Sequence, residues 1–346
     1  EATSEAYRLL GLIEPELNLL ETTLDLLRTQ VGGYYDPKTK RFYMMNSFNQ
    51  GAMADIILAH ELTHALDDQR YDLQAMFAVA KGNADYEFAV RAVVEGSGTS
   101  LMNLFAIQGV MKGWLTLDAA SMNAMMAEQA ESMQDAPPYL IITLALPYLE
   151  GNKLLTRKAD TMVAAMAVPD PEDLKASFLS PPKSSEQVLH FEKYWDADQL
   201  DEPTILDLPD LSHELGDGWV LEDKNVLGEL GCFIMTARQL PDLASAQGQI
   251  AGRWTNDAAT GWDGDLYQSY LAPDGQRLLH WTSVWDTPDD AKEFAEALEE
   301  RLSIENGFLK SVARSGQVVR VAFANDKCSK SALAANAEIP KFELTR

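Results

Sequence analysis

Residues 52–69 have the sequence AMADIILAHELTHALDDQ, and this stretch decides how the rest of the chain is interpreted. Its apolar residues recur at helical spacing and predict a single stripe buried against the core. The stripe consists of Ile56, Ile57, Ala59, Leu62, Ala65 and Leu66. Neither proline nor glycine interrupts the pattern, so we expect one continuous helix here.

His60-Glu61-Leu62-Thr63-His64 is the part of this helix that carries chemistry. Two histidines at positions i and i+4 project from one helical face, so both imidazoles can reach one Zn²⁺ ion. Glu61 then lies beside the first ligand, where a carboxylate can take a proton from an attacking water. A structural histidine pair with satisfied hydrogen bonds is the alternative.

A catalytic zinc site needs a third protein ligand, and Glu95 is the candidate. It lies in an apolar helical run, Val93 to Gly98, where an unpaired charge would be costly. Gly96 and Gly98 would allow this second helix to approach the first closely. The alternative is a surface ion pair between Glu95 and Arg91, four residues earlier.

Other carboxylates near the motif are weaker candidates for ligation. Asp67 and Asp68 are expected to form a solvated pair or to support the ligands from outside, and Glu87 also competes. The metzincin extension of the motif requires Gly and His where this chain has Asp67 and Arg70, which excludes that class.

Composition excludes several classes of partner. The 346 residues carry 53 Asp and Glu against 28 Lys and Arg, for a net charge of -25. Such a surface repels a phosphate backbone, so nucleic acid is excluded as a partner. The longest apolar stretch, Tyr139 to Leu149, is about half the ~20 residues that a membrane helix needs, so no transmembrane segment is expected.

The chain begins Glu1-Ala2-Thr3 without an initiator Met, which favours an exported protein whose leader has been removed. In that case Cys232 and Cys328 could form a disulfide, and two buried free thiols are the alternative. The oligomeric state is left open.

The fold class expected is α+β, with a mostly helical domain at 1–205 and a smaller α+β domain at 206–346. The boundary falls in the Asp- and Pro-rich stretch Asp196 to Pro209. Expected helices cover 4–30 with a break near Pro15, 52–69, 86–108, 117–133, 148–166, 185–193, 227–240 and 289–302. Expected strands cover 34–35, 42–45, 266–271, 277–285 and 317–323.

Several segments together resemble the gluzincin class of zinc peptidases, and more closely a bacterial family of largely uncharacterised, often exported, minigluzincin-like proteins. The segments are HELTHALDDQRYDL (60–73), AVVEGSG (92–98), Leu146-Pro147-Tyr148 with Gly151, PPKSSEQVLHFEKY (181–194), GELG (228–231) and GWDGD (261–265). In gluzincins a glutamate on a later helix completes the HExxH site, and here that position is Glu95.

The resemblance implies a zincin-like, mostly helical catalytic core and a peptide or protein substrate. It also implies a mixed sheet whose edge strand, Arg41 to Met45, lies above the motif helix and pairs with an extended peptide. One position departs from the pattern: gluzincins often have an aspartate four residues after the ligand glutamate, where this chain has Thr99.

Peptide hydrolysis also needs a donor for the developing oxyanion. The first candidate is His190, which we expect Glu186 to orient from one turn earlier, and the second is Tyr148. His280 is interpreted as an ordinary strand residue, and the C-terminal tryptophans as a packed core without chemistry.

The function expected from these patterns is zinc-dependent hydrolysis of peptide bonds by an endopeptidase or an exopeptidase. The alternative is a catalytically inactive zincin-fold protein that binds a partner or acts as a scaffold.

Overall fold

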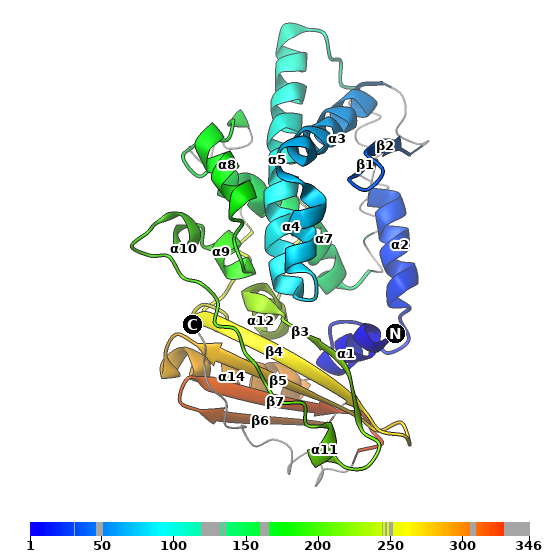
Figure 1. Cartoon of the computed structure of the whole chain (residues 1–346), viewed down its shortest axis with the longest axis vertical. Coiled ribbons are helices and arrows are strands. Elements are labelled where there is room, and N and C mark those ends of the chain that lie inside the picture. Colours follow the sequence, from blue (N-terminus) through cyan, green and yellow to red (C-terminus); the bar gives the residue numbers. More distant parts are fainter. Residues whose placement is uncertain are drawn as a thin grey trace.

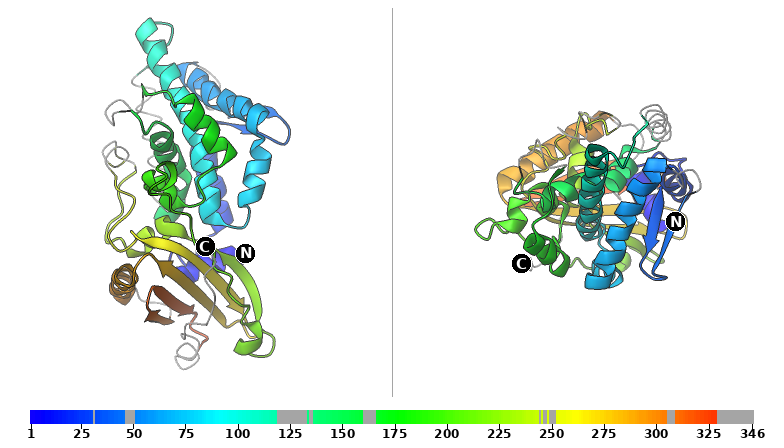
Figure 2. Two further views of the ribbon diagram at one scale, coloured as in Figure 1. Left: turned by 60° about the vertical axis from the view of Figure 1, so that its left-hand side comes forward. Right: turned by 90° about the horizontal axis from the view of Figure 1, so that it is seen from above.

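The structure is a computed structural model, and it describes residues 1–30, 32–45, 51–118, 133, 136–159, 166–243, 245, 248, 252–304 and 309–328. Helices and strands are mixed, which confirms the α+β class at that level. A group of helices stands on one face of an antiparallel sheet (Figures 1 and 2). No described helix is long and apolar enough to cross a membrane.

The N-terminal segment forms two helices, α1 (Ala2–Leu10) and α2 (Leu19–Gln30). Gly11 ends α1 in the left-handed conformation, with φ 73°, which a residue without Cβ adopts at little cost. Pro15 lies in the connection between the two helices, as expected. The α1 helix contacts β3 and β7 of the C-terminal sheet, so the first residues pack against the last strands.

A hairpin precedes the motif helix, as predicted. Strands β1 (Gly33–Asp36) and β2 (Arg41–Met44) are antiparallel, with Tyr35 opposite Phe42. Asp36 accepts hydrogen bonds from the backbone N–H of Lys38 and the hydroxyl of Thr39, which closes the turn.

Three consecutive helices form the centre of the helical part: α3 (Gly51–Tyr71), α4 (Leu73–Ala80) and α5 (Ala84–Lys112). The side chains of Asp72 and Asn83 cap α4 and α5, since each accepts a bond from a backbone N–H of the first turn. Helix α4 was not predicted from the sequence, and α5 was.

Helix α7 (Pro138–Leu155) packs along α5 at glycine contacts. A Cβ at Gly96 would lie 2.3 Å from the carbonyl carbon of Gly151, and one at Gly151 would lie 1.9 Å from the oxygen of Ala92. The two backbones therefore touch where α5 carries Glu95. The prediction for this region, a helix from Tyr148 to Met166, was wrong at both ends.

Short helices complete the helical part: α8 (Pro171–Leu179), α9 (Ser185–Leu189) and α10 (Glu192–Trp195). The predicted helix at 185–193 is therefore broken at His190. The predicted helix at 117–133 lies outside the described residues except at its ends.

The C-terminal sheet has the order β3-β4-β5-β7-β6, and every neighbouring pair is antiparallel. Its strands are β3 (Val220–Asn225), β4 (Trp262–Leu271), β5 (Arg277–Trp285), β6 (Leu309–Ser315) and β7 (Val318–Ala324). Helices α12 (Gly228–Thr236) and α14 (Pro288–Ile304) contact it, and α11 (Ser212–Leu215) lies at one end. β3 and β6 were not predicted.

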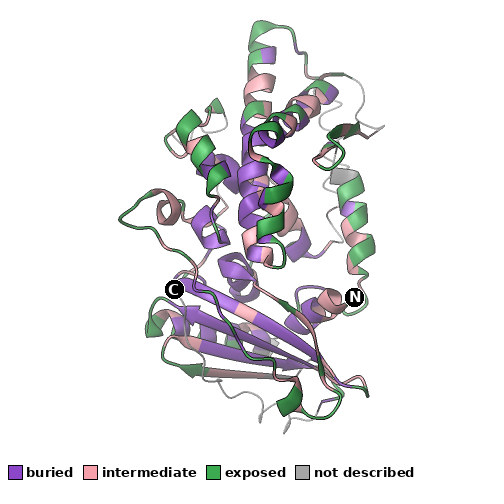
Figure 3. Cartoon of the chain, in the orientation of Figure 1, coloured by how far each residue is buried: buried purple, intermediate pink, exposed green. Residues whose placement is uncertain are grey.

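One hydrophobic core runs from the helices into the sheet, and Figure 3 shows buried residues continuing across the junction. It joins α1, α5 and α7 to the tryptophans at 254, 262, 281 and 285, which form the packed core that the sequence predicted. A polar bond also crosses the junction, because the backbone N–H of Ala84 on α5 donates to the Asn225 side chain on β3. The division at 205/206 stays a prediction.

Candidate metal centre

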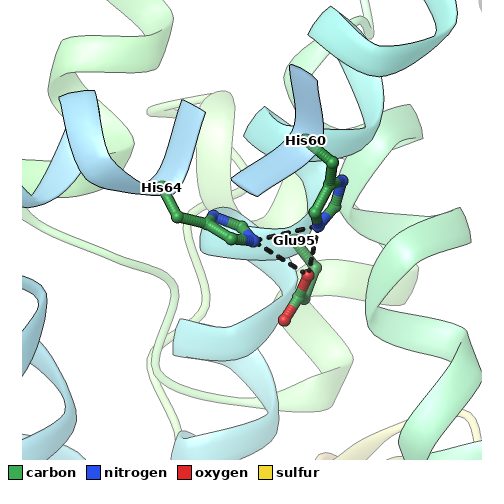
Figure 4. A group of neighbouring side chains, drawn as sticks. All are labelled: His60, His64 and Glu95. Atoms are coloured by element: carbon green, nitrogen blue, oxygen red, sulfur yellow. Dashed lines mark hydrogen bonds and ion pairs between the residues drawn. The ribbon is translucent and has the colours of Figure 1, made fainter. Parts of the chain in front are cut away.

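Three side chains predicted as zinc ligands converge where α3 packs against α5 (Figure 4). The Nε2 atom of His60 lies 2.9 Å from that of His64 and 3.1 Å from Oε2 of Glu95. The Nε2 atom of His64 lies 3.4 Å from the same oxygen. Each residue therefore turns one potential ligand atom toward a common point.

The size of this triangle fits a tetrahedral zinc ion. With bonds of about 2.1 Å and tetrahedral angles, ligand atoms lie about 3.4 Å from one another. The three separations here are 2.9, 3.1 and 3.4 Å, so a small outward shift of the ligand atoms would bring them to that geometry. Two neutral imidazoles and one carboxylate are also a ligand set that zinc accepts.

Glu95 faces the histidines and not Arg91, since no pair between Glu95 and Arg91 is found among the ion pairs of the described residues. Burial alone raises the pKa of the Glu95 carboxyl, but its hydrogen bonds to His60 and His64 outweigh burial. The net pKa is well below the ordinary value, so the carboxylate is ionised and available as a ligand.

Gly98 makes room for the ring of His60. A Cβ at position 98 would lie 2.6 Å from Cε1, 2.8 Å from Nδ1 and 2.9 Å from Nε2 of that ring. Any side chain here would displace the imidazole, so glycine is required one turn after Glu95.

The atoms behind the ligands are less completely bonded. Nδ1 of His60, Nδ1 of His64 and the hydroxyl of Thr99 are buried, and none of them has a hydrogen-bond partner. If both Nε2 atoms bind a metal, each Nδ1 carries a proton that has no acceptor. Histidines that bind zinc usually donate this proton to a carboxylate, a backbone carbonyl or water. The ligand triangle therefore fits zinc, whereas its outer support does not follow the common pattern.

Asp67 and Asp68 are buried, so a solvated pair is wrong. Asp67 accepts a hydrogen bond of 2.7 Å from the hydroxyl of Ser97, which ties α3 to α5 beside the ligands. Asp68 accepts from the Tyr35 hydroxyl at 2.7 Å and from the Lys40 ammonium at 2.6 Å. These contacts fix the hairpin to the motif helix.

The face of α3 that is buried differs from the prediction. Leu62 is 50% exposed and Leu66 is 53% exposed, so the expected apolar stripe is wrong at both positions. The helix turns His60, His64 and the aspartates inward, because their partners lie on α5 and on the hairpin.

Glu61 is also buried, and its pKa is raised by burial, with a further contribution from the charge of Glu95 and opposition from His64 and His60. The backbone N–H of Tyr35 also interacts with this carboxylate. The expected base therefore lies beside the ligands and against strand β1.

Strand β1 makes the main contacts with the motif helix, which corrects the expected edge strand at 41–45. The sheet here is a two-stranded hairpin and not a mixed sheet. Gly32 and Met45 form a hydrogen-bonded pair, because Met45 N–H donates to the carbonyl of Gly32. Hydrogen-bonded and non-hydrogen-bonded pairs alternate along an antiparallel hairpin. The N–H and C=O groups of Gly33 and Tyr35 therefore point away from β2. The free edge of β1 therefore faces Glu61.

The two candidate oxyanion donors lie in different places. The ring of Tyr148 stacks on His60, with centroids 5.7 Å apart. Burial raises the pKa of Tyr148 well above its ordinary value, and the charges of Glu95 and Glu61 add to this, so its hydroxyl keeps its proton. The structure thus brings Tyr148 to the ligands.

His190 does not join the ligands. Its Nε2 lies 2.9 Å from Oε1 of Glu229, at the end of α9. The expected partner Glu186 is bound instead by the ammonium of Lys193 at 2.6 Å, so that part of the prediction was wrong. The break of the helix at His190 turns its ring toward α12.

Comparison with known proteins adds one match. A family model described as "Domain of unknown function (DUF8575)" matches residues 217–332. The matched part holds strands β3 to β7 and none of the three candidate ligands. No curated protein and no solved structure matches the chain.

Sequence reasoning missed Tyr35 and Ser97 as residues of this site. Ser97 lies between two glycines that had been singled out for close packing, and this was a usable signal. Tyr35 gave no signal, because its approach to Glu61 depends on how the hairpin folds over α3.

Proposed function

We propose that this chain hydrolyses peptide bonds with a zinc ion held by His60, His64 and Glu95, and that Glu61 is the general base. The observation that carries the proposal is the convergence of three ligand atoms from two helices, at separations of 2.9 to 3.4 Å. The helices around this centre would then form a zincin-like catalytic core.

Bound zinc would polarise the scissile carbonyl and lower the pKa of a bound water. Glu61 takes the proton of the attacking water and passes it to the leaving amine. Its burial supports this role, since a raised pKa makes a carboxylate a stronger base. Tyr148 keeps its hydroxyl proton beside the ligands, where it bonds Glu95, and it would donate to the oxyanion by turning from Glu95; His190 is bonded to Glu229 away from the ligands.

The free edge of β1 supports a peptide as substrate. An extended chain pairs with an unpaired strand edge through main-chain hydrogen bonds, whatever its side chains. The outward groups of Gly33 and the outward C=O of Tyr35 would hold such a chain beside Glu61, whose carboxylate bonds the Tyr35 N–H.

The test combines metal analysis with a peptide-library assay on protein purified without chelator. Wild type should hold about one zinc per chain, and His64→Ala should hold almost none. Glu61→Gln should keep the zinc and lose hydrolysis by at least about 100-fold. Glu87→Gln on α5 is the matched control and should leave both unchanged. Full hydrolysis by Glu61→Gln would reject the assigned base.

A second candidate is an inactive zincin-fold protein that binds a partner. The unpaired Nδ1 atoms and the unpaired Thr99 hydroxyl favour it, because catalytic zinc histidines are normally supported from outside. Stoichiometric zinc without hydrolysis of any peptide in the library, by wild type as well as by Glu61→Gln, would favour this second candidate.

A further inference from the structure

The face of the C-terminal sheet that points away from the helices is covered by an extended segment, 204–211, which crosses the strands in Figure 1. Backbone bonds hold it there, since Thr204 N–H donates to Asp263 and Leu211 N–H donates to the Tyr270 hydroxyl. Leu206 and Leu208 pack on Val284 in a small apolar cluster. The segment therefore shields this face from water.

A polar group lies on the same face, between that cluster and a second one around Leu278. It consists of Arg320 on β7 and His280 and Thr282 on β5, where Thr282 is the cross-strand partner of Arg320. Arg320 and His280 are each 1% exposed, and Thr282 is 0% exposed. All three side chains are thus closed off from solvent.

The hydrogen bonds of this group leave three nitrogen donors and one hydroxyl unpaired. One nitrogen of Arg320, Nη2, donates to Nδ1 of His280, so the proton of a neutral His280 is on Nε2. The unpartnered atoms are Nε and Nη1 of Arg320, Nε2 of His280 and Oγ1 of Thr282. The three nitrogens can only donate, whereas the hydroxyl can donate or accept, so this interior has fewer hydrogen-bond acceptors than donors.

The group also carries an uncompensated positive charge. Burial lowers the pKa of Arg320 to about 10, so the guanidinium is charged at neutral pH. Burial and the nearby Arg320 lower the pKa of His280 to about 3, so the imidazole is neutral. Among the described residues no carboxylate pairs with Arg320, and an isolated buried cation is strongly unfavourable.

We propose that a small monovalent inorganic anion of the halide class binds beside the Arg320 guanidinium and the Thr282 hydroxyl and completes this face of the sheet. One net positive charge matches one monovalent anion, whereas a phosphate dianion would bring a second charge without a partner. Water alone would supply an acceptor but would leave the charge uncompensated. The site is independent of the metal centre on α3 and α5.

The first experiment compares thermal unfolding of the whole chain in sodium chloride, sodium bromide and sodium gluconate at equal ionic strength. Wild type should gain several degrees in Tm between about 1 and 100 mM halide over the gluconate series, because a ligand of the folded state stabilises it by mass action. Arg320→Met, of similar volume, should lose that difference. Equal Tm in halide and gluconate for wild type overturns the proposal.

Thr282→Val is the second variant, because it removes one donor and keeps the charge and the shape. It should need several-fold more halide than wild type for the same Tm gain. This variant tests the proposed anion site even if Arg320→Met does not fold. Crystals grown with bromide should show an anomalous peak within hydrogen-bond distance of the Arg320 guanidinium. Bromide peaks at the surface only, or a larger stabilisation by phosphate than by halide, overturn the assignment.

Discussion

Replacing Gly98 by alanine should remove zinc from the candidate centre while the fold persists. The new methyl group would lie 2.6 Å from Cε1 of His60, whereas carbon atoms in contact lie about 3.5 to 4.0 Å apart. The ring must therefore retreat by about 1 Å, and metal bonds tolerate about 0.2 Å. Because the change also gains up to about 1 kcal/mol of helix propensity on α5, unfolding should be little affected.

We expect zinc affinity of Gly98→Ala to fall at least about 100-fold, equivalent to about 2.7 kcal/mol. The measurement is competition with a chromophoric zinc chelator at fixed pH, and circular dichroism follows the unfolding of the same samples. Gly96→Ala is the contrasting variant: its methyl group would meet the backbone of Gly151 at 2.3 Å, so it should lower Tm strongly. Zinc affinity of a folded Gly98→Ala within threefold of wild type would refute the derived geometry.

Three further predictions concern buried polar groups. Burial raises the pKa of Asp85 from 3.8 to about 7. The stability that this group contributes is therefore complete below about pH 4 and is lost as pH rises through 7. In urea unfolding, the Asp85→Asn variant should lose this pH dependence of the unfolding free energy, which amounts to up to about 4 kcal/mol in wild type. Lys193→Met should lower the free energy of unfolding by about 3 kcal/mol, because Glu186, whose side chain is 1% exposed, loses its cation. Adding Glu186→Gln should restore most of that stability, and no rescue would contradict this pairing. Cys232 is free and 0% exposed, and burial raises its thiol pKa, so native protein should resist alkylation there, and rapid labelling would contradict its burial.

The sequence predicted that the three candidate ligands lie together because the information is local. His60 and His64 are one turn apart on any helix. Glu95 is a charged residue in an apolar run, where burial without a partner would be unfavourable. The hairpin was predictable for a similar reason, since turn residues separate two short β-rich runs. Strand β5 was predicted with the bounds that the structure has.

What failed depends on distant partners. Leu62 and Leu66 satisfied the apolar periodicity but point outward, because the buried side of α3 is chosen by bonds to α5 and the hairpin. His190 was paired with Glu186 on helical spacing, and a break in the helix and the ammonium of Lys193 changed both partners. Local periodicity holds no information about such contacts.

Of the two alternatives for Cys232 and Cys328, a disulfide or two buried free thiols, the structure has the free thiols. The buried cation at Arg320 could not be foreseen, because only the pairing of β5 with β7 places it beside Thr282 under the segment at 204–211. In the sequence it is one arginine within an ordinary strand.

The docking of α1 on the C-terminal sheet has a consequence for how the protein is made. Strands β3 and β7, which α1 contacts, leave the ribosome long after α1 itself. Helices α3 and α5 follow one another closely and can pack much earlier in synthesis. A nascent chain can therefore assemble its three candidate ligands first, while its opening helix keeps an apolar side exposed to chaperones until translation is nearly finished.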